Sequence, residues 1–229
     1  MLVKDYMTRH PIMIAPNKRA LEAQQVMAEN GVRHLPVVAD GKILQGLVTN
    51  KCLSIPPEKL ASLEVWEITR YLSSLTVEKI MLKKGADLVT INPQATLEDA
   101  ADLMIRHKIE GMPVVDDDGV VVGILTEVDL LSELRELLGA TDPGWRIVVR
   151  IPGRLGEYAK LTGAISGQNW PIMAMGSVRT PKDPEHWDMV LKVTGCDKDQ
   201  LIAIVNDIPD HELVDIRETR MYSRQPEPA

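Results

Sequence analysis

Two stretches of the sequence place a threonine directly after a short apolar run, where a phosphate and a sugar could be held. In the later stretch, Gly123–Asp129, the hydroxyl of Thr126 is followed three residues on by the carboxylate of Asp129. These groups can contact a phosphate and ribose hydroxyls, and a glycine lets a ligand approach the backbone. The earlier stretch, Gly46–Cys52, ends instead in Cys52. A thiol cannot accept two hydroxyl hydrogen bonds as a carboxylate can.

A purely structural role would account for the same residues. Thr126 could satisfy the end of a strand, and Asp129 could cap the helix that follows it. The duplication of the pattern favours a ligand site over this alternative. Two roles are likewise open for His34, which could contact a phosphate or could be a hydrogen-bonded structural residue of a strand.

The two stretches belong to a repeat with an offset of 77 residues. Chance does not readily keep one offset over five positions, so residues 1–55 and 76–139 are predicted to be two copies of one unit. The pairs at this offset are Pro16 and Pro93, Met27 and Met104, Pro36 and Pro113, Gly46 and Gly123, and Thr49 and Thr126.

Each copy has the pattern of strand, helix, strand, strand and helix. The first strand is an apolar run, Ile12–Ile14 or Leu88–Ile91, and the next two strands flank a polar turn. Thr96 with Asp99 predicts an N-cap box for the first helix of the second copy, whereas Arg19 offers the first copy no such cap. The predicted strand pairs are His34–Val38 with Ile43–Val48, and Met112–Val115 with Val120–Leu125.

The remaining segments are a linker, a further domain and a tail. Residues 56–75 follow two prolines with an amphipathic pattern and are expected to form a helical linker. Residues 145–218 read as strand, helix, strand, strand, helix and strand, which predicts a small α+β sandwich. Residues 219–229 are polar and are expected to be disordered.

Composition excludes several classes of function. The 229 residues contain no apolar run of membrane-spanning length, carry a net charge of −7 and include only Cys52 and Cys196 as thiols. These features predict a cytoplasmic chain that binds neither membranes nor nucleic acid. No His-x-x-x-His pair, nucleophile elbow or Walker-type loop occurs, so neither a catalytic site nor a metal site is predicted.

The repeated motifs resemble a tandem pair of CBS domains. The residues that carry this resemblance are His34–Val38 with Gly46–Thr49, and Met112–Asp116 with Gly123–Asp129. The C-terminal part resembles an ACT domain at Ile151–Leu155 and Gly167–Trp170, and the whole order is similar to the AcuB acetoin-utilisation proteins. The expected fold is α+β, with two tandem CBS units (β-α-β-β-α) forming one module and a C-terminal βαββαβ, ferredoxin-like ACT domain.

The resemblance implies a non-enzymatic regulatory protein that binds AMP, ADP, ATP or S-adenosylmethionine as an effector and requires no other cofactor. Its implied partners are a second copy of the chain, bound through the CBS units, and an unknown regulated protein. Thr126 would contact the phosphate and Asp129 the ribose hydroxyls. The other residues implied to line this cleft are Ile124 and Glu110 from the second copy and Ile12, Val32, Arg33 and His34 from the first.

Three further expectations concern the rest of the chain. A second cleft, at Thr49, Leu47 and Ile109, is expected to be weak or empty because Cys52 replaces the carboxylate, and Glu110 is expected to oppose a polyphosphate in the first cleft. In the ACT-like domain, the turn with Gly153 and Leu155 could contact an effector or serve dimer packing. The alternatives to an adenosine sensor are a structural module with non-binding clefts and, from the family name alone, an enzyme of acetoin or acetyl-group metabolism.

Overall fold

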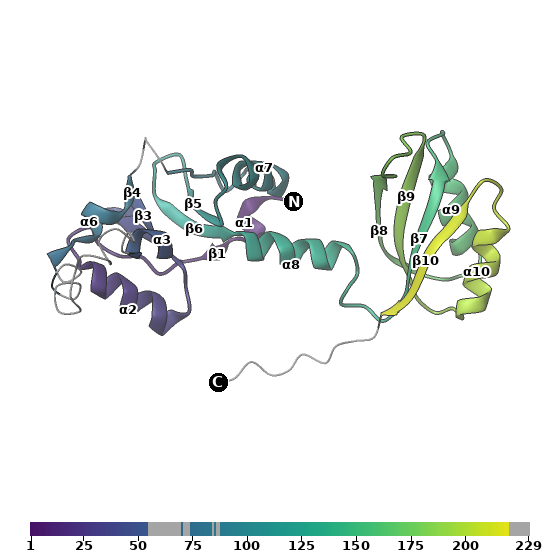
Figure 1. Ribbon diagram of the computed structural model, residues 1–229, viewed down its shortest axis with the longest axis horizontal. Helices are drawn as coiled ribbons and strands as arrows, with labels where there is room; N and C mark the ends of the chain where they lie inside the picture. The colour runs from purple at the N-terminus through teal and green to yellow at the C-terminus, as the bar shows by residue number, and fades with distance from the viewer. Residues whose placement is uncertain (55–69, 71–73, 84, 86–87, 220–229) are drawn as a thin grey trace. The chain divides into compact units, whose positions relative to one another are not determined.

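The computed structural model describes residues 1–54, 70, 74–83, 85 and 88–219. Its contacts divide the chain into two units, Met1–Leu130 and Leu131–Ala229, each of which is described by itself (Figure 1). Of the predicted linker, residues 55–69 and 71–73 lie outside the described residues, and so does the predicted tail beyond Thr219. No described helix is both long enough and apolar enough to cross a membrane.

The first unit contains one antiparallel sheet for each copy of the repeat, with three strands apiece among the described residues. In both sheets the register sets the start of one strand opposite the threonine that ends the next, so His34 faces Thr49 and Gly111 faces Thr126. The sheet of the first copy contains β2 (His34–Val38), β3 (Leu44–Thr49) and β4 (Leu82–Lys83), and that of the second contains β5 (Gly111–Val115), β6 (Val121–Thr126) and β1 (Thr8–Arg9).

The helices of this unit begin and end where local chemistry dictates. Thr96 precedes α7, its hydroxyl accepts a hydrogen bond from the amide of Asp99 at 3.0 Å, and the Asp99 carboxylate accepts one from the Thr96 amide at 3.1 Å. The predicted capping box is therefore confirmed. The helices are α1 (Val3–Tyr6), α2 (Ala20–Asn30), α3 (Asn50–Leu53), α6 (Val77–Ile80), α7 (Leu97–His107) and α8 (Glu127–Leu137), and a 3-10 turn spans Asp40–Lys42.

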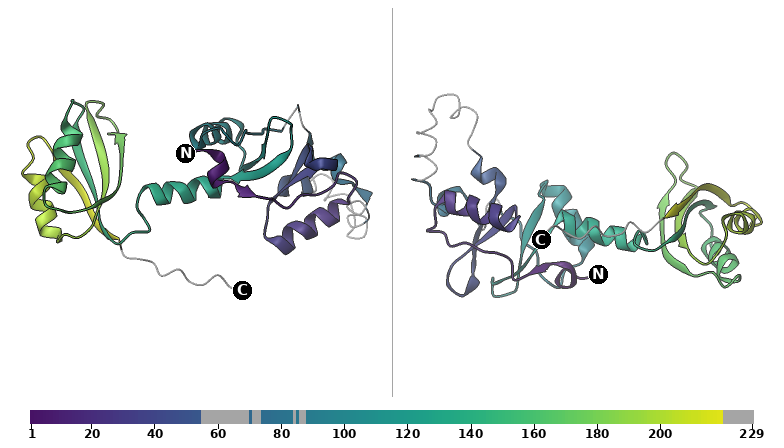
Figure 2. Two further views of the ribbon diagram at one scale, coloured as in Figure 1. Left: turned by 180° about the vertical axis from the view of Figure 1, so that it is seen from behind. Right: turned by 90° about the horizontal axis from the view of Figure 1, so that it is seen from below.

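The two copies exchange their leading segments, which the sequence analysis did not predict (Figure 2). Strand β1 comes before the first copy but pairs with β6 of the second, and β4 comes before the second copy but pairs with β3 of the first. The short helices before these two strands are exchanged as well. Val3 of α1 is buried in the core of the second copy, and Val77 of α6 is buried in the core of the first. The exchange joins the two copies into one unit.

The predicted strands Ile12–Ile14 and Leu88–Ile91 are reduced to single parallel bridges, from Ile14 to Val37 and from Ile91 to Val114. The reason lies in the neighbouring prolines. Ile14 donates to the carbonyl of Pro36, and Val38 donates to the carbonyl of Ile14, but the ladder cannot continue because proline has no amide hydrogen.

The second unit has the predicted βαββαβ order. Its sheet is antiparallel, with strand order β10-β7-β9-β8. Both helices cover one face of the sheet, where Ile147, Val149 and Ile151 pack against Leu161 and Leu201 in a fully buried core (Figure 1). This topology is ferredoxin-like. The elements are β7 (Gly144–Pro152), α9 (Glu157–Ser166), β8 (Ile172–Arg179), β9 (His186–Val193), α10 (Lys198–Asn206) and β10 (Glu212–Thr219).

Candidate functional site

A cavity of about 300 Å³, which we name the Thr126 cleft, lies between the two copies of the first unit. Six of the eight predicted ligand residues line it, namely Ile12, Val32, Arg33, His34, Ile124 and Thr126. The other lining residues are Thr8, His10, Pro11, Gly31 and Val128.

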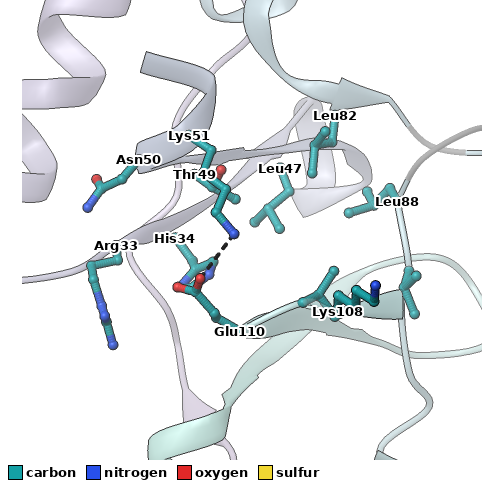
Figure 3. Close-up of a pocket in the computed structure, with 13 residues that line it drawn as sticks. Arg33, His34, Leu47, Thr49, Asn50, Lys51, Leu82, Leu88, Lys108 and Glu110 are labelled. Atoms are coloured by element: carbon teal, nitrogen blue, oxygen red, sulfur yellow. Dashed lines mark hydrogen bonds and ion pairs between the residues drawn. The ribbon is translucent and has the colours of Figure 1, made fainter. Parts of the chain in front are cut away.

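A second cavity, of about 170 Å³, lies between the copies around Thr49, and we name it the Thr49 cleft (Figure 3). All three residues predicted for the second cleft, Leu47, Thr49 and Ile109, line it. Arg33 and His34 line this cavity as well as the Thr126 cleft. The remaining lining residues are Asn50, Lys51, Leu82, Leu88, Val89, Lys108, Glu110 and Gly111.

The two cavities are related by the internal repeat. Nine of the eleven residues of the Thr126 cleft have their counterpart, 77 residues away, in the Thr49 cleft. Each cavity combines the threonine at the end of a strand in one copy with the end of a helix and the start of a strand in the other copy. Thr126 accordingly lies with residues 31–34, and Thr49 with residues 108–111.

Thr126 and Asp129 are joined by two hydrogen bonds. The amide and the hydroxyl of Thr126 both donate to Oδ2 of Asp129, at 2.7 Å each, where α8 begins. In this arrangement the carboxylate caps the helix, which is the structural role considered for the pair. Among the hydrogen bonds of the described residues, Oδ1 of Asp129 takes part in none, so this oxygen can still accept hydroxyl hydrogens.

Thr49 and Cys52, the counterparts of Thr126 and Asp129, make a weaker contact. Thr49 Oγ1 lies 3.4 Å from Cys52 Sγ, in a contact in which either atom could donate. Sulfur is a poor acceptor, so the Thr49 cleft has no group at this position that could hold a ribose diol.

The placement of Glu110 in the Thr126 cleft was wrong. Glu110 lines the Thr49 cleft, because it belongs to the same copy as Thr126 and each cleft draws its helix end from the opposite copy. There its carboxylate accepts a hydrogen bond from Lys51 Nζ at 3.1 Å, in an ion pair between the copies (Figure 3). The predicted opposition of Glu110 to a polyphosphate in the Thr126 cleft therefore has no basis.

His34 stands between the two cavities. Burial lowers its pKa, and the positive charge of Arg33 acts in the same direction, whereas the carboxylate of Glu110 opposes the shift. A neutral imidazole at physiological pH follows. Its ring fits against Gly111, where a Cβ atom would lie 3.4 Å from Cε1 of His34 and 3.3 Å from Cγ2 of Thr126.

Sequence reasoning missed the charged residues of the Thr49 cleft and two polar residues of the Thr126 cleft. The 77-residue offset could have found Lys51 and Lys108. They are the counterparts of Val128 and Gly31, which line the Thr126 cleft. Thr8 and His10 enter the Thr126 cleft through the exchanged segment, which no local pattern predicts. No cluster of three metal-binding side chains occurs among the described residues.

Of the two residues of the predicted effector turn in the second unit, Gly153 and Leu155, one lines a cavity. Gly153 lines an open hollow of about 820 Å³, together with Arg154, Arg179 and Trp187. Leu155 does not line it and is fully exposed. The Arg179 guanidinium stacks over the Trp187 ring, with 5.0 Å from Cζ to the ring centroid.

Comparisons with known proteins agree with these features. A family model for the CBS domain matches residues 3–53 and 77–136. The CBS domain-containing protein YhcV from Bacillus subtilis is 30% identical over an alignment that covers 56% of this chain and 81% of that protein. Homoserine O-acetyltransferase from Methanocorpusculum labreanum is 34% identical, over 58% of this chain and 24% of that protein. The chain spans less than half the length of the first curated relatives that it matches.

Two solved structures are similar to part of this chain. The crystal structure of MJ1225 from Methanocaldococcus jannaschii aligns with a TM-score of 0.50 and 28% identity, over 58% of this chain and 47% of that chain. That of AcuB from Vibrio cholerae aligns with a TM-score of 0.49 and 30% identity, over 62% of this chain and 98% of that chain. The repeat, the paired clefts and the family match together establish that the chain belongs to the CBS-domain family, with two CBS units in tandem.

Proposed function

We propose that this protein is a non-enzymatic regulator that binds an adenosine-type ligand in the Thr126 cleft. The observation that carries the proposal is that Thr126 lines a cavity between the copies and is hydrogen-bonded to Asp129, which does not line the cavity itself but keeps one carboxylate oxygen to accept hydroxyl hydrogens. Its Cys52 counterpart lacks that capacity. The ribose of the ligand would therefore be held in one cleft of the two.

The lining of the Thr126 cleft suits the parts of a nucleotide. Ile12, Val32 and Ile124 offer an apolar wall for a purine, and the exposed guanidinium of Arg33 offers a positive charge for a phosphate. With Glu110 in the other cleft, no carboxylate of the described residues lines this cavity. AMP, ADP, ATP and S-adenosylmethionine are therefore all candidate effectors.

Binding between the copies offers a route to regulation. A ligand that contacts both copies shifts their relative placement if its affinity differs between the two arrangements. We propose that this change is passed to the ferredoxin-like unit, which we infer to be an ACT-like domain that acts on an unidentified partner. We also propose a homodimer formed through the CBS units, which size-exclusion chromatography with light scattering tests.

Isothermal titration calorimetry with AMP, ADP, ATP and S-adenosylmethionine tests the ligand class. Asp129→Ala removes the acceptor for the ribose hydroxyls, and hydrogen bonds to charged groups are worth about 1.5–3 kcal/mol each. We expect the affinity to fall at least about tenfold. Cys52→Ala is the matched control at the counterpart position and should leave the affinity unchanged. An Asp129→Ala variant that binds as tightly as the wild type would remove the ribose contact.

The second candidate function is that of a structural or interaction module. It is favoured by one observation, that both protons of the Thr126 amide and hydroxyl are already donated to Asp129, so the pair is complete as a helix cap. This candidate expects no thermal shift with any of the four adenosine compounds. A shift with one of them, lost in Asp129→Ala, decides against it.

A further inference from the structure

Helix α8 and the residue after it carry four leucines that the fold does not bury. They are between 41% and 62% exposed, and none belongs to a core cluster of the described residues. Single exposed leucines are normal on a protein surface, but these recur at spacings of three and four residues and so share one face of the helix. We name this face the leucine stripe, and its members are Leu131, Leu134, Leu137 and Leu138.

The leucine stripe lies on regular helix up to its last residue. The amide of Leu138 donates to the carbonyl of Leu134 at 3.1 Å, and the helix then ends at Gly139, whose φ is +61°. The amide of Gly139 donates back to the carbonyl of Glu136 at 2.8 Å, which closes the last turn. A helix with an apolar face of this width is typical of one that packs against another element. The stripe is therefore a preformed surface for a partner.

The charges of α8 indicate what kind of partner the stripe fits. The helix carries four carboxylates and one arginine, Arg135, in a chain whose net charge is −7. Glu127 lies one helical turn before Leu131. Glu133 lies one turn before Leu137, so both carboxylates border the stripe. Electrostatic complementarity therefore favours a basic partner.

The same charges disfavour two other occupants of the stripe. A second copy of α8 would set four carboxylates and one arginine against an identical set, which brings like charges together. An anionic membrane surface attracts amphipathic helices that have lysine and arginine on the polar face, and α8 has the opposite charge. A basic segment of another protein complements both the leucines and the carboxylates.

We propose that the leucine stripe is the docking surface for a basic amphipathic helix of a different protein. The apolar face of that helix packs on the stripe, and its lysines or arginines pair with Glu127 and Glu133. The inference names the kind of partner on which the proposed regulator acts, and it rests on the proposed function only for the existence of that partner. The proposed homodimer is a separate contact, because it forms through the CBS units and the stripe belongs to the second unit.

Fluorescence anisotropy with a labelled helical peptide of leucine and lysine, titrated with the full chain, tests the proposal. We expect saturable binding that weakens as salt is added, because salt screens exposed charges. Leu131→Ser/Leu134→Ser should weaken the binding at least about tenfold, because the apolar contacts of two leucines are lost. Glu127→Gln/Glu133→Gln should weaken it about two- to fivefold, as expected for exposed ion pairs.

The matched controls lie outside the stripe. Leu155 is a fully exposed leucine of the second unit, and Glu29 is an exposed carboxylate on α2. Leu155→Ser and Glu29→Gln should leave the affinity for the peptide unchanged. Because the stripe leucines are exposed, Leu131→Ser/Leu134→Ser should unfold at the same urea concentration as the wild type.

Absence of peptide binding overturns the proposal, as does equal binding of a leucine and glutamate peptide or wild-type affinity in Leu131→Ser/Leu134→Ser. Size-exclusion chromatography with light scattering tests the second copy, because a dimer that becomes a monomer in that variant would assign the stripe to self-association and overturn the proposal. Vesicles of phosphatidylcholine and phosphatidylserine that bind the wild type but not the variant overturn it too. Failure of the proposed function is distinct, because it appears as a lack of nucleotide binding in calorimetry while the peptide still binds.

Discussion

Two glycines at the same repeat position make room for the exchanged segments, and replacing them tests the exchange. A Cβ atom on Gly46 would lie 2.5 Å from the carbonyl oxygen of Leu82 and 2.6 Å from Sδ of Met81. The first contact is with backbone of β4, so relief requires β4 to move away from β3. On Gly123, a Cβ atom would meet mainly the side chain of Met7, with the nearest backbone atom, the oxygen of Thr8, at 3.1 Å.

The expected magnitudes follow from which atoms must move. Overpacking of a well-packed site lowers the free energy of unfolding by about 1–3 kcal/mol. A glycine-to-alanine substitution also raises it by about 0.4–1 kcal/mol, because it reduces the conformational entropy of the unfolded chain. We expect Gly46→Ala to lower the free energy of unfolding of the first unit by about 2 kcal/mol. Gly123→Ala should cost less, about 1 kcal/mol, because the flexible Met7 side chain can turn aside.

Urea unfolding followed by far-ultraviolet circular dichroism measures these changes, with a separate transition allowed for each unit. Gly163→Ala is the control, since a Cβ atom there has nothing within 4 Å and the residue lies inside α9. It should gain about 0.5–1 kcal/mol. The reasoning is refuted if Gly46→Ala is as stable as the wild type, or if Gly123→Ala loses more than Gly46→Ala.

Three further predictions concern caps and buried charges. Thr96→Ala should lower the free energy of unfolding by about 1 kcal/mol in the same urea assay, whereas Thr96→Ser should keep the cap. Lys192 is 1% exposed, and burial lowers its pKa. The free energy of unfolding of the wild type should therefore rise with pH towards about pH 10. In urea titrations Lys192→Met should be more stable than the wild type at neutral pH and should lack that rise. A hydrogen bond from Lys160 lowers the pKa of the buried Glu157, so its contribution is present above the ordinary carboxyl pKa and is lost as pH falls through the lowered value. Glu157→Gln should weaken the acid dependence of thermal unfolding.

Local and repeated patterns were enough to predict much of the fold. The capping box at Thr96 follows from two residues three apart, and the βαββαβ order follows from hydrophobic periodicity. The exchange of β1 and β4 could not follow from such patterns, because strand pairing at long range depends on which sheet edge the segment reaches. One signal existed, since Val3 and Met7 recur as Val77 and Met81 at an offset of 74 residues, not 77.

The candidate site was predicted for the residues that the motif itself orders. Thr126, Val32 and His34 line the Thr126 cleft, whereas Asp129 is hydrogen-bonded to Thr126 but does not line the cavity. The binding roles that the resemblance implies for these residues stay predictions. The prediction for Glu110 was wrong because each cleft takes its two walls from different copies. Glu110 is the counterpart of Arg33 at the 77-residue offset, so it lines the Thr49 cleft as Arg33 lines the Thr126 cleft. Applying the repeat to every residue of the site, rather than to the motif alone, corrects the error.

The same repeat explains why two clefts built alike are chemically unlike and yet are not independent. Each cleft takes its threonine from one copy and its helix end from the other, so a residue that differs between the copies alters one wall of a single cleft. Lys51 does so in the Thr49 cleft, and Cys52 contacts the threonine of that cleft. Arg33 and His34 are exceptions, because both line the two cavities. We therefore expect a ligand in one cleft to change the charge and the space available to a ligand in the other, so that this shared wall would couple the two clefts.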